Sequence, residues 1–472
     1  MKPVKIGIDA RMFSDAFTGI GRYTYELTHR FFEMHPDVEW VLFLNEPQYS
    51  QFDFPANVRK VRVNAPHYSF AEQTRFLRLL TREKCDLVHF THFNVPLFYR
   101  GKFVVTIHDT TISFFPGKKF KSWWRRAAYR LVISRAISRA KKVITVSHNT
   151  AADVQKLFSV SREKVIPIWN GIGTDFHPCS ETEHERVRRK FQLSPQFLLY
   201  TGVWREHKNL VGLLRAFALL KSSHPDLQLV ITGREDPHYP EVLSTIRELG
   251  LSESVKCVGL VDFPDLQALY SAATVYVFPS FYEGFGLPPL EAMAAGTPVA
   301  ASNSSAIPEV CGEAAHFFNS RSPEDMARKM EEIFQDTELR AGLIARGQER
   351  IKKFDWDQSA AETLRVYGSV VQFPTGTHTK LLRRFFSSLS CCRWERFPRR
   401  ERSCIRRFGS SFRRLCRRCV LRPSRTRWMI GCLTGRMKRG NFTKANPRSF
   451  IARGIVFLMM LFEKPWREGP KK

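Results

Sequence analysis

Cysteine is scarce in the part of the sequence that has regular patterns. Only four of the ten cysteines precede Lys380, and they are scattered. The other six follow Lys380, where "CRRC" is a single Cys-x-x-Cys with no second pair at zinc-finger distance. The sequence therefore indicates neither a disulfide framework nor a zinc finger, and it favours a reducing compartment.

Long apolar segments are also missing. The longest run, "GIVFLMMLF" at 454–462, is far shorter than the roughly 20 residues that cross a bilayer as a helix. The opening segment "VKIGIDA" already has a strand pattern, without a charged and then apolar leader before it. We expect a cytoplasmic protein that contacts membranes only at their surface.

Acidic residues are rare toward the C-terminal end. From Lys380 onward there are 27 Lys and Arg against 4 Asp and Glu, so the first 379 residues carry only +6 of the net charge of +29. Residues 375–472 mix Arg, Ser, Cys and Phe without a period, which predicts a basic Arg/Cys-rich tail of low order or the product of a frameshift. A basic arm that binds anionic lipid or RNA is the functional alternative.

Short β-branched runs alternate with longer helical patterns through about residue 370, which is typical of an α/β fold with parallel sheets. Seven strand patterns precede "GIGTDFHPCSETEHE" (171–185) and six follow it, so we place the linker there. A chain of 472 residues suggests about two domains. We predict a first domain over 1–175, a second over 176–356, a helix over 357–374 and the tail over 375–472.

The segment "PSFYEGFGLPPLEAMAAGTPV" (279–299) sets Glu283 directly after a strand pattern and Glu291 eight residues later. Ligands of open α/β sheets lie beyond the carboxyl ends of the strands. Glycines at 284 and 286 permit close approach of the backbone, and Pro288 and Pro289 predict a helix start with Glu291 in the first turn. The two carboxylates then suit hydroxyl groups at either end of a ligand with an anionic middle. The alternative is a helix charge and a solvated loop residue.

Other strand ends carry further candidates. "YTGVWREHKNL" places Arg205 and Lys208 between a strand and a helix, where cations neutralise a diphosphate or are simply surface charges. "VVTIHDT" ends a strand with His108 and Asp109, and this histidine has a purely structural alternative. In "TGIGRYTYEL", Gly19 and Gly21 are placed to bring amides to a phosphate or to form a tight turn.

The stretch "FYEGFGLPPLEAMAAGTPV", followed by "ASNSSAIPEVCGEAAHFFNSRSPEDMA", resembles the Glu-x7-Glu motif of retaining glycosyltransferases of family 4. The resemblance extends over about residues 4–370. It implies the GT-B fold, in which two Rossmann-like β/α/β domains face a central cleft. The first would be the acceptor-side domain, the second would bind the nucleotide sugar, and the helix over 357–374 would cross back to the first.

The resemblance also implies roles for the candidates. Glu283 would contact the donor sugar, as a group that orients the hexose and stabilises oxocarbenium-like charge, and Glu291 would contact the ribose. His108 would also contact the sugar, oriented by Asp109. The remaining donor-binding positions would be Gly19, Gly21, Arg205, Lys208, Val261 (through its backbone at the base), Gly284, Phe285 and Gly286. Many relatives have arginine where this chain has Val203, so Lys208 is the firmer cation.

No Asp-x-Asp follows a strand in the manner of metal-dependent GT-A enzymes, so we predict no cofactor and no obligatory metal. The motifs look most like bacterial mannosyltransferases of polysaccharide assembly. This implies transfer of a hexose, mannose from GDP-mannose, to a saccharide or polyprenyl-linked acceptor. A UDP-sugar donor, a sugar-nucleotide epimerase or phosphorylase, and a lipid- or nucleic-acid-binding protein that acts through its tail remain alternatives. No specific nucleic-acid partner is expected.

Residues 118–142 combine many cations with Trp123, Trp124, Tyr129, Leu131 and Ile133 at roughly helical spacing. Such a helix is able to lie on an anionic bilayer with its aromatic residues at the headgroups. We therefore predict peripheral contact with the cytosolic face of the inner membrane. The alternative is a helix that covers a sheet with its apolar face.

Overall fold

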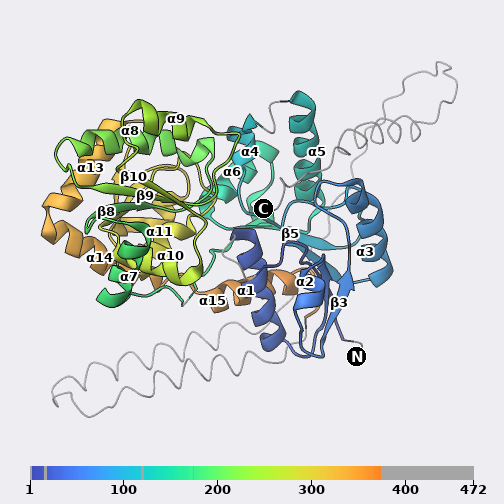
Figure 1. Cartoon of the computed structure of the whole chain (residues 1–472). Helices are drawn as coiled ribbons and strands as arrows, with labels where there is room; N and C mark the ends of the chain where they lie inside the picture. The colour runs from blue at the N-terminus through green and yellow to red at the C-terminus, as the bar shows by residue number, and fades with distance from the viewer. Residues whose placement is uncertain (1–2, 15–18, 119–121, 174, 374–472) are drawn as a thin grey trace, which may run out of the picture. The chain divides into compact units, whose positions relative to one another are not determined.

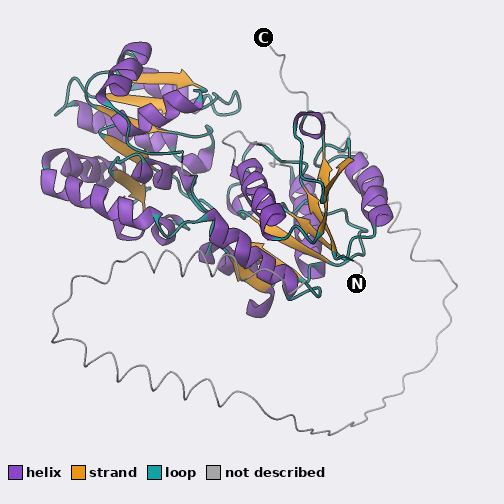
Figure 2. Cartoon of the chain, turned by 90° about the horizontal axis from the view of Figure 1, so that it is seen from below, coloured by secondary structure: helices purple, strands orange, loops and turns teal. Residues whose placement is uncertain are grey.

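The computed structural model describes residues 3–14, 19–118, 122–173 and 175–373 (Figure 1). Within these ranges the chain forms two all-parallel sheets, of seven and six strands, with helices packed beside them (Figure 2). The predicted α/β class is confirmed, and each predicted strand is present. The predicted tail over 375–472 lies outside the described residues.

The first sheet has the strand order β3-β2-β1-β4-β5-β6-β7. Its strands are continuous apolar runs such as "FVVTI" in β5, because both faces of a helix-covered parallel sheet are buried. The strands are β1 (Lys5–Asp9), β2 (Glu39–Leu44), β3 (Val58–Arg62), β4 (Leu87–Phe90), β5 (Phe103–Ile107), β6 (Lys142–Thr145) and β7 (Val165–Pro167). The helices between them are α1 (Gly19–Met34), α2 (Gln48–Gln51), the π-helical η1 (Glu72–Phe76), α3 (Leu77–Glu83), α4 (Thr111–Phe114), α5 (Trp123–Arg139), α6 (His148–Phe158) and the 3-10 turn η3 (Arg162–Lys164).

The second sheet repeats this plan with the order β10-β9-β8-β11-β12-β13. Its strands are β8 (Phe197–Tyr200), β9 (Gln228–Thr232), β10 (Val255–Gly259), β11 (Val275–Phe278), β12 (Val299–Ser302) and β13 (Ala315–Phe318). The accompanying helices are α7 (Glu181–Phe191), η4 (Glu206–Lys208), α8 (Leu210–Lys221), α9 (Glu241–Glu248), α10 (Phe263–Ala272), α11 (Leu287–Ala294), α12 (Ile307–Cys311), η5 (Gly312–Ala314), α13 (Pro323–Gln335) and α14 (Thr337–Ile351).

The strand order reverses at one point in each sheet, between β1 and β4 in the first and between β8 and β11 in the second. At such a point the loops that leave the two neighbouring strands diverge to opposite faces of the sheet. Ligands of doubly wound folds bind in the space that this divergence creates. The loops after β8 and β11, on either side of the reversal in the second sheet, are therefore candidates for binding a ligand.

The last described helix, α15 (Trp356–Gly368), follows the second sheet in sequence but packs against α1 of the first domain. The Tyr367 hydroxyl lies 2.6 Å from Nδ1 of His89 in β4, and Arg30 of α1 donates to Asp357 at 2.6 Å. The helix starts one residue earlier and ends six residues earlier than the predicted range of 357–374. The exact domain boundaries stay a prediction.

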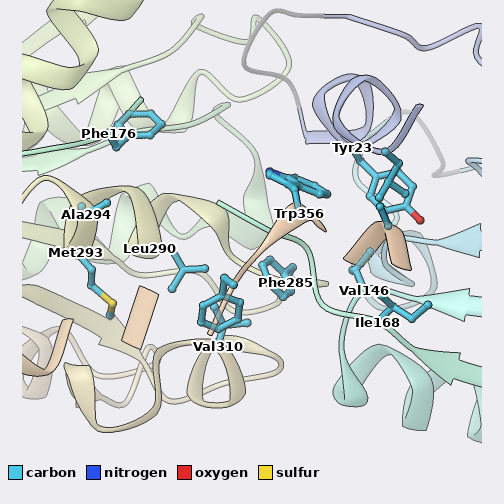
Figure 3. Close-up of a cluster of buried hydrophobic side chains, with 14 of the residues drawn as sticks. Tyr23, Val146, Ile168, Phe176, Phe285, Leu290, Met293, Ala294, Val310 and Trp356 are labelled. Atoms are coloured by element: carbon cyan, nitrogen blue, oxygen red, sulfur yellow. The ribbon is translucent and has the colours of Figure 1, made fainter. Parts of the chain in front are cut away.

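One continuous cluster of buried side chains includes residues from both domains and from α15 (Figure 3). Tyr23 and Ile168 belong to the first domain, Phe285 and Leu290 to the second, and Trp356 to α15. The burial of these apolar side chains stabilises the arrangement in which the loops of the two domains meet.

Helix α5 has apolar residues that are buried against the protein and others that are exposed. Tyr129 and Ile133 are buried, so they belong to the face that packs on the protein and not to a membrane face, which corrects the expectation for these two residues. Trp123 and Leu131 stay exposed, at 75% and 47%. None of the helices in the described ranges is long and apolar enough to cross a membrane.

Replacing Tyr367 with Phe is expected to lower the free energy of unfolding by about 1–2 kcal/mol, because His89 then loses one of its two buried hydrogen-bond partners. Burial lowers the pKa of His89 to about 3, so the imidazole is neutral and needs both partners. Urea unfolding measures the change. Tyr49→Phe is the matched control, and equal stability of Tyr367→Phe and wild type would contradict the account.

Candidate active site

The loops after β8 and β11 bring together the firmest of the predicted residues. Lys208 Nζ lies 2.6 Å from Glu283 Oε1, although the two residues are 75 positions apart in sequence. Both side chains are largely buried, at 16% and 13% exposure. The reversal of strand order between β8 and β11 explains the meeting, because it makes these two loops neighbours.

Two residues that sequence reasoning missed hold this pair. Asn209 adopts a left-handed conformation (φ 55°), and its side-chain amide donates to the carbonyl groups of Pro279 and Ser320. Ser305 accepts a hydrogen bond from the backbone N–H of Glu283 at 2.8 Å. Asn209 could have been predicted from the sequence, because asparagine is among the few residues that tolerate this conformation next to a helix start.

Glu291 lies on α11, which begins at Leu287 directly after Gly286. Glu291 is therefore the fifth residue of the helix and lies beyond the first turn, contrary to the expectation. The helix starts earlier because Gly286, at φ 115°, turns the chain into it before the two prolines. The first turn itself contains no acidic residue.

The Glu291 carboxylate belongs to a chain of hydrogen bonds whose other members are buried residues of the second domain. Tyr270 donates to Glu291 Oε2 at 2.8 Å, and the same hydroxyl lies 2.7 Å from Thr201 Oγ1. Tyr276 also contacts Thr201, at 3.1 Å. Burial raises the pKa of Glu291 to about 7, although the Tyr270 hydrogen bond and the charge of Arg22 act in the opposite direction.

In the first domain, His108 follows β5 and its Nε2 lies 2.8 Å from the Thr91 carbonyl. A carbonyl oxygen only accepts, so Nε2 carries the proton and Nδ1 is left as an acceptor. Burial lowers the pKa of His108, which keeps the ring neutral, and Tyr23 packs edge-on at 4.8 Å. Asp109 instead accepts from the Thr111 amide, so its orienting role stays a prediction.

Gly284 connects the two halves of the candidate site. A Cβ added at this position would lie 1.9 Å from the carbonyl oxygen of His108, so no other residue can occupy it without displacing backbone. The sequence predicted that the bare backbone here approaches a ligand. In the structure it approaches the strand end that carries His108, which places the loop of Glu283 beside the first domain.

The other predicted positions are more dispersed. Gly19 and Gly21 open α1, after residues 15–18, which lie outside the described ranges. Arg205 is exposed at the start of η4, and Val261 lies between β10 and α10. Phe285 is buried in the cluster of Figure 3, where its ring lies 5.8 Å from that of Phe354. The donor-binding roles of these residues stay predictions.

Among the described residues, no group of three or more His, Cys, Asp and Glu side chains is arranged to hold a metal ion. The expectation that the reaction needs no metal stays a prediction. The candidate site thus combines the Lys208–Glu283 ion pair and the Glu291 carboxyl of the second domain with the neutral His108 imidazole of the first.

Two family models match this chain. Residues 17–176 match the model described as Glycosyltransferase Family 4, and residues 181–350 match Glycosyl transferases group 1. The chain is 30% identical over 372 residues to the O-antigen chain mannosyltransferase B of Escherichia coli, which covers 74% of this chain and 96% of that protein. The chain belongs to glycosyltransferase family 4. The resemblance drawn from the sequence is thus confirmed.

Two further likenesses extend the comparison of this family 4 glycosyltransferase. The O-antigen chain mannosyltransferase RfbU of Salmonella typhimurium is 28% identical over 272 residues, covering 57% of this chain and 70% of that protein. The solved structure of the sucrose-phosphate synthase of Thermosynechococcus elongatus has a TM-score of 0.64 at 20% identity, over 82% of this chain and 100% of that chain. The second likeness concerns the fold, which is GT-B.

Replacing Glu291 with Gln is expected to change how stability depends on pH. The pKa of about 7 in the folded protein lies above the ordinary 4.5, so the stabilisation from this carboxyl is complete below about pH 4.5 and is lost as the pH rises to 7. The loss is about 1.4 kcal/mol per pH unit. Relative to wild type, Glu291→Gln should therefore gain about 2–3 kcal/mol between pH 5 and pH 8, measured by urea unfolding.

Glu313→Gln is the matched control, because Glu313 is exposed and its carboxylate forms no hydrogen bond or ion pair with the residues that the structure describes. It should follow wild type at each pH. Parallel pH profiles of Glu291→Gln and wild type would contradict the raised pKa.

Proposed function

We propose that this glycosyltransferase transfers a hexose, mannose from GDP-mannose, with retention of configuration to a saccharide or lipid-linked saccharide in polysaccharide or lipopolysaccharide assembly. The observation that carries the proposal is the Lys208–Glu283 pair at the reversal of strand order, with Glu291 one helix turn beyond the glycine loop. The names of the relatives, O-antigen chain mannosyltransferases, support mannose as the sugar.

Each group suits one part of a sugar diphosphate. The Lys208 ammonium neutralises charge on the departing diphosphate, and Glu283 accepts hydrogen bonds from the hexose while it stabilises positive charge that develops at the ring. Glu291 accepts hydrogen bonds from the ribose hydroxyls. Before the donor binds, Lys208 and Glu283 neutralise each other, so neither charge is buried without a partner.

The neutral His108 supports a contact to a sugar hydroxyl. Its Nδ1 is an acceptor because the Thr91 carbonyl fixes the proton on Nε2. In the transfer, the bond between the sugar C1 and the phosphate oxygen breaks, and the acceptor oxygen bonds to C1 on the same face. The released phosphate takes the acceptor's proton, so Glu283 is not a nucleophile.

Other readings of the site remain as candidates. A UDP-hexose suits the same carboxylates and cation, since the hexose, the ribose and the diphosphate are common to both kinds of donor. An epimerase would convert the sugar nucleotide without an acceptor, and a protein that acts through its basic tail would bind lipid or nucleic acid. The first experiment separates these readings.

Incubation with a panel of GDP- and UDP-sugars, with and without a saccharide acceptor, is expected to show consumption of GDP-mannose that depends on the acceptor. Glu283→Gln should lower kcat by about 100-fold or more, because an electrostatic contact made at the reacting sugar is typically worth several kcal/mol. Lys208→Ala should mainly raise KM for the donor. Released nucleoside diphosphate is the measured product.

Glu313→Gln should behave as wild type in the same assay. Consumption of a sugar nucleotide without any acceptor would favour the epimerase. Preference for a UDP-sugar would mean that the donor is a UDP-sugar and not GDP-mannose. Wild-type activity in both site variants, with folding verified, would contradict the assignment of the site.

We also propose that α5 contacts an anionic membrane surface. The support is the exposure of Trp123 and Leu131 beside the exposed Arg130 and Arg139. The buried Tyr129 and Ile133 anchor the helix to the first domain instead. This contact would bring a lipid-linked acceptor to the enzyme.

Replacing Leu131 with Ser in the full chain is expected to weaken binding to vesicles that contain phosphatidylglycerol by about fivefold, because a half-exposed leucine contributes about 1 kcal/mol when its apolar surface is buried. Leu219→Ser is the matched control, since Leu219 is a helical leucine with the same 47% exposure in the second domain. Co-sedimentation measures both. Equal losses in the two variants, or none in Leu131→Ser, would contradict the proposed surface.

A further inference from the structure

The first turn of α6 is tied to the loop that carries Glu283. Ser147, the N-cap residue of α6, donates its hydroxyl to the Gly284 carbonyl at 2.7 Å, and Thr150 donates to the same oxygen at 3.0 Å. Both hydroxyl groups belong to fully buried residues. The Ser147 oxygen also accepts the Thr150 N–H, so one short segment caps its own helix and holds a carbonyl from the other domain.

Asp153 of α6 contacts Tyr282, the residue that precedes Glu283. The Tyr282 hydroxyl donates to Asp153 Oδ2 at 2.5 Å and lies 2.8 Å from Thr110 Oγ1. Thr150 and Asp153 are three positions apart and therefore lie on one face of the helix. The residues before and after Glu283 are thus both fixed by α6, while the Glu283 side chain itself points to Lys208.

The N-terminal end of α6 is in turn held by the second domain. Glu309 of α12 accepts hydrogen bonds from the N–H groups of His148 and Asn149 at 2.8 and 2.9 Å, and from the Trp169 indole at 2.7 Å. These N–H groups have no partner within the helix, and a carboxylate at this end also interacts favourably with the helix dipole. Arg350 binds the backbone carbonyls of Glu309 and Val310, which fixes α12.

We propose that α6 of the first domain is a positioning element for Glu283, with Thr150 and Asp153 acting through Gly284 and Tyr282 and with Glu309 holding the helix in register. The inference rests on the proposed function in one respect, that Glu283 serves the donor hexose. Its consequence is that the acceptor-side domain sets the placement of a carboxylate that belongs to the donor-binding domain. Productive geometry at the sugar then requires the contact of the two domains.

The nucleotide end of the site is supported differently. The hydrogen-bonded neighbours of Glu291 that the structure describes, Tyr270 with Thr201 and Tyr276 behind it, all lie in the second domain. Loss of an α6 contact should therefore affect the chemical step more than nucleotide affinity. A small misplacement of a reacting group is known to reduce rates strongly without loss of binding.

The experiment uses Thr150→Val and Tyr282→Phe in the full chain, which remove one hydroxyl each and keep the shape of the side chain. We expect kcat with the preferred donor to fall about tenfold in each variant, and the Kd of GDP and of UDP to stay within about twofold of wild type. Glu309→Gln should show the same split between kcat and nucleotide affinity.

The matched controls are Thr81→Val and Tyr49→Phe. The Thr81 hydroxyl donates to the Leu77 carbonyl of its own helix α3, and Tyr49 lies in the short helix α2. Both should keep wild-type kcat. Unchanged kcat in Thr150→Val and Tyr282→Phe overturns the inference, as does a loss of nucleotide binding in proportion to a loss of thermal stability. A wild-type protein that consumes no donor overturns the proposed function and this inference together. If the wild-type protein turns over donor and the variants have the same kcat, only this inference is overturned.

Discussion

The reversal of strand order in the second sheet is the constraint on which the site depends. The strands β8 and β11 are neighbours, so the loops that follow them start side by side. Lys208 and Glu283 meet there at 2.6 Å, although they are 75 residues apart in sequence. A pair so little exposed costs desolvation free energy that the ion pair and the surrounding hydrogen bonds must offset. In the first sheet, His108 follows β5, and its backbone carbonyl lies against Gly284 in the loop of Glu283.

Contacts between the domains give the site a second layer of organisation. Gly284 lies against the His108 backbone, its carbonyl accepts two hydroxyl groups from α6, and Tyr282 reaches Asp153 of the same helix. Glu309 completes the connection in the opposite direction, from α12 to the first turn of α6. The hydroxyl groups of Ser147 and Thr150 are buried, so an unmade bond to the Gly284 carbonyl would leave a polar atom without compensation. The two domains are therefore matched to each other in chemistry as well as in shape.

Much of this was predictable, and the failures have physical causes. The strand patterns were found because parallel strands covered on both faces must be continuous apolar runs. The start of α11 was placed too late because proline marks a helix start only within a few residues, while the conformation of Gly286 decides it. Some apolar residues of α5 are buried and others are exposed. Periodicity predicts an apolar face but does not say whether protein or lipid covers it. Asn209 and Ser305 were missed because their partners come from distant loops.

The sequence by itself determined the α/β class, the two sheets, the family and the segments that contain the charged residues, because these depend on local periodicity and on the spacing of residues within one loop. Only the tertiary structure decided that Glu291 is buried enough for its pKa to rise to about 7, that the Thr91 carbonyl fixes the proton of His108, and that α6 holds both neighbours of Glu283. Burial and hydrogen bonding between residues on different strands and helices have no local signature. They arise when the sheets and helices pack, and that packing raises the pKa of the Glu291 carboxyl.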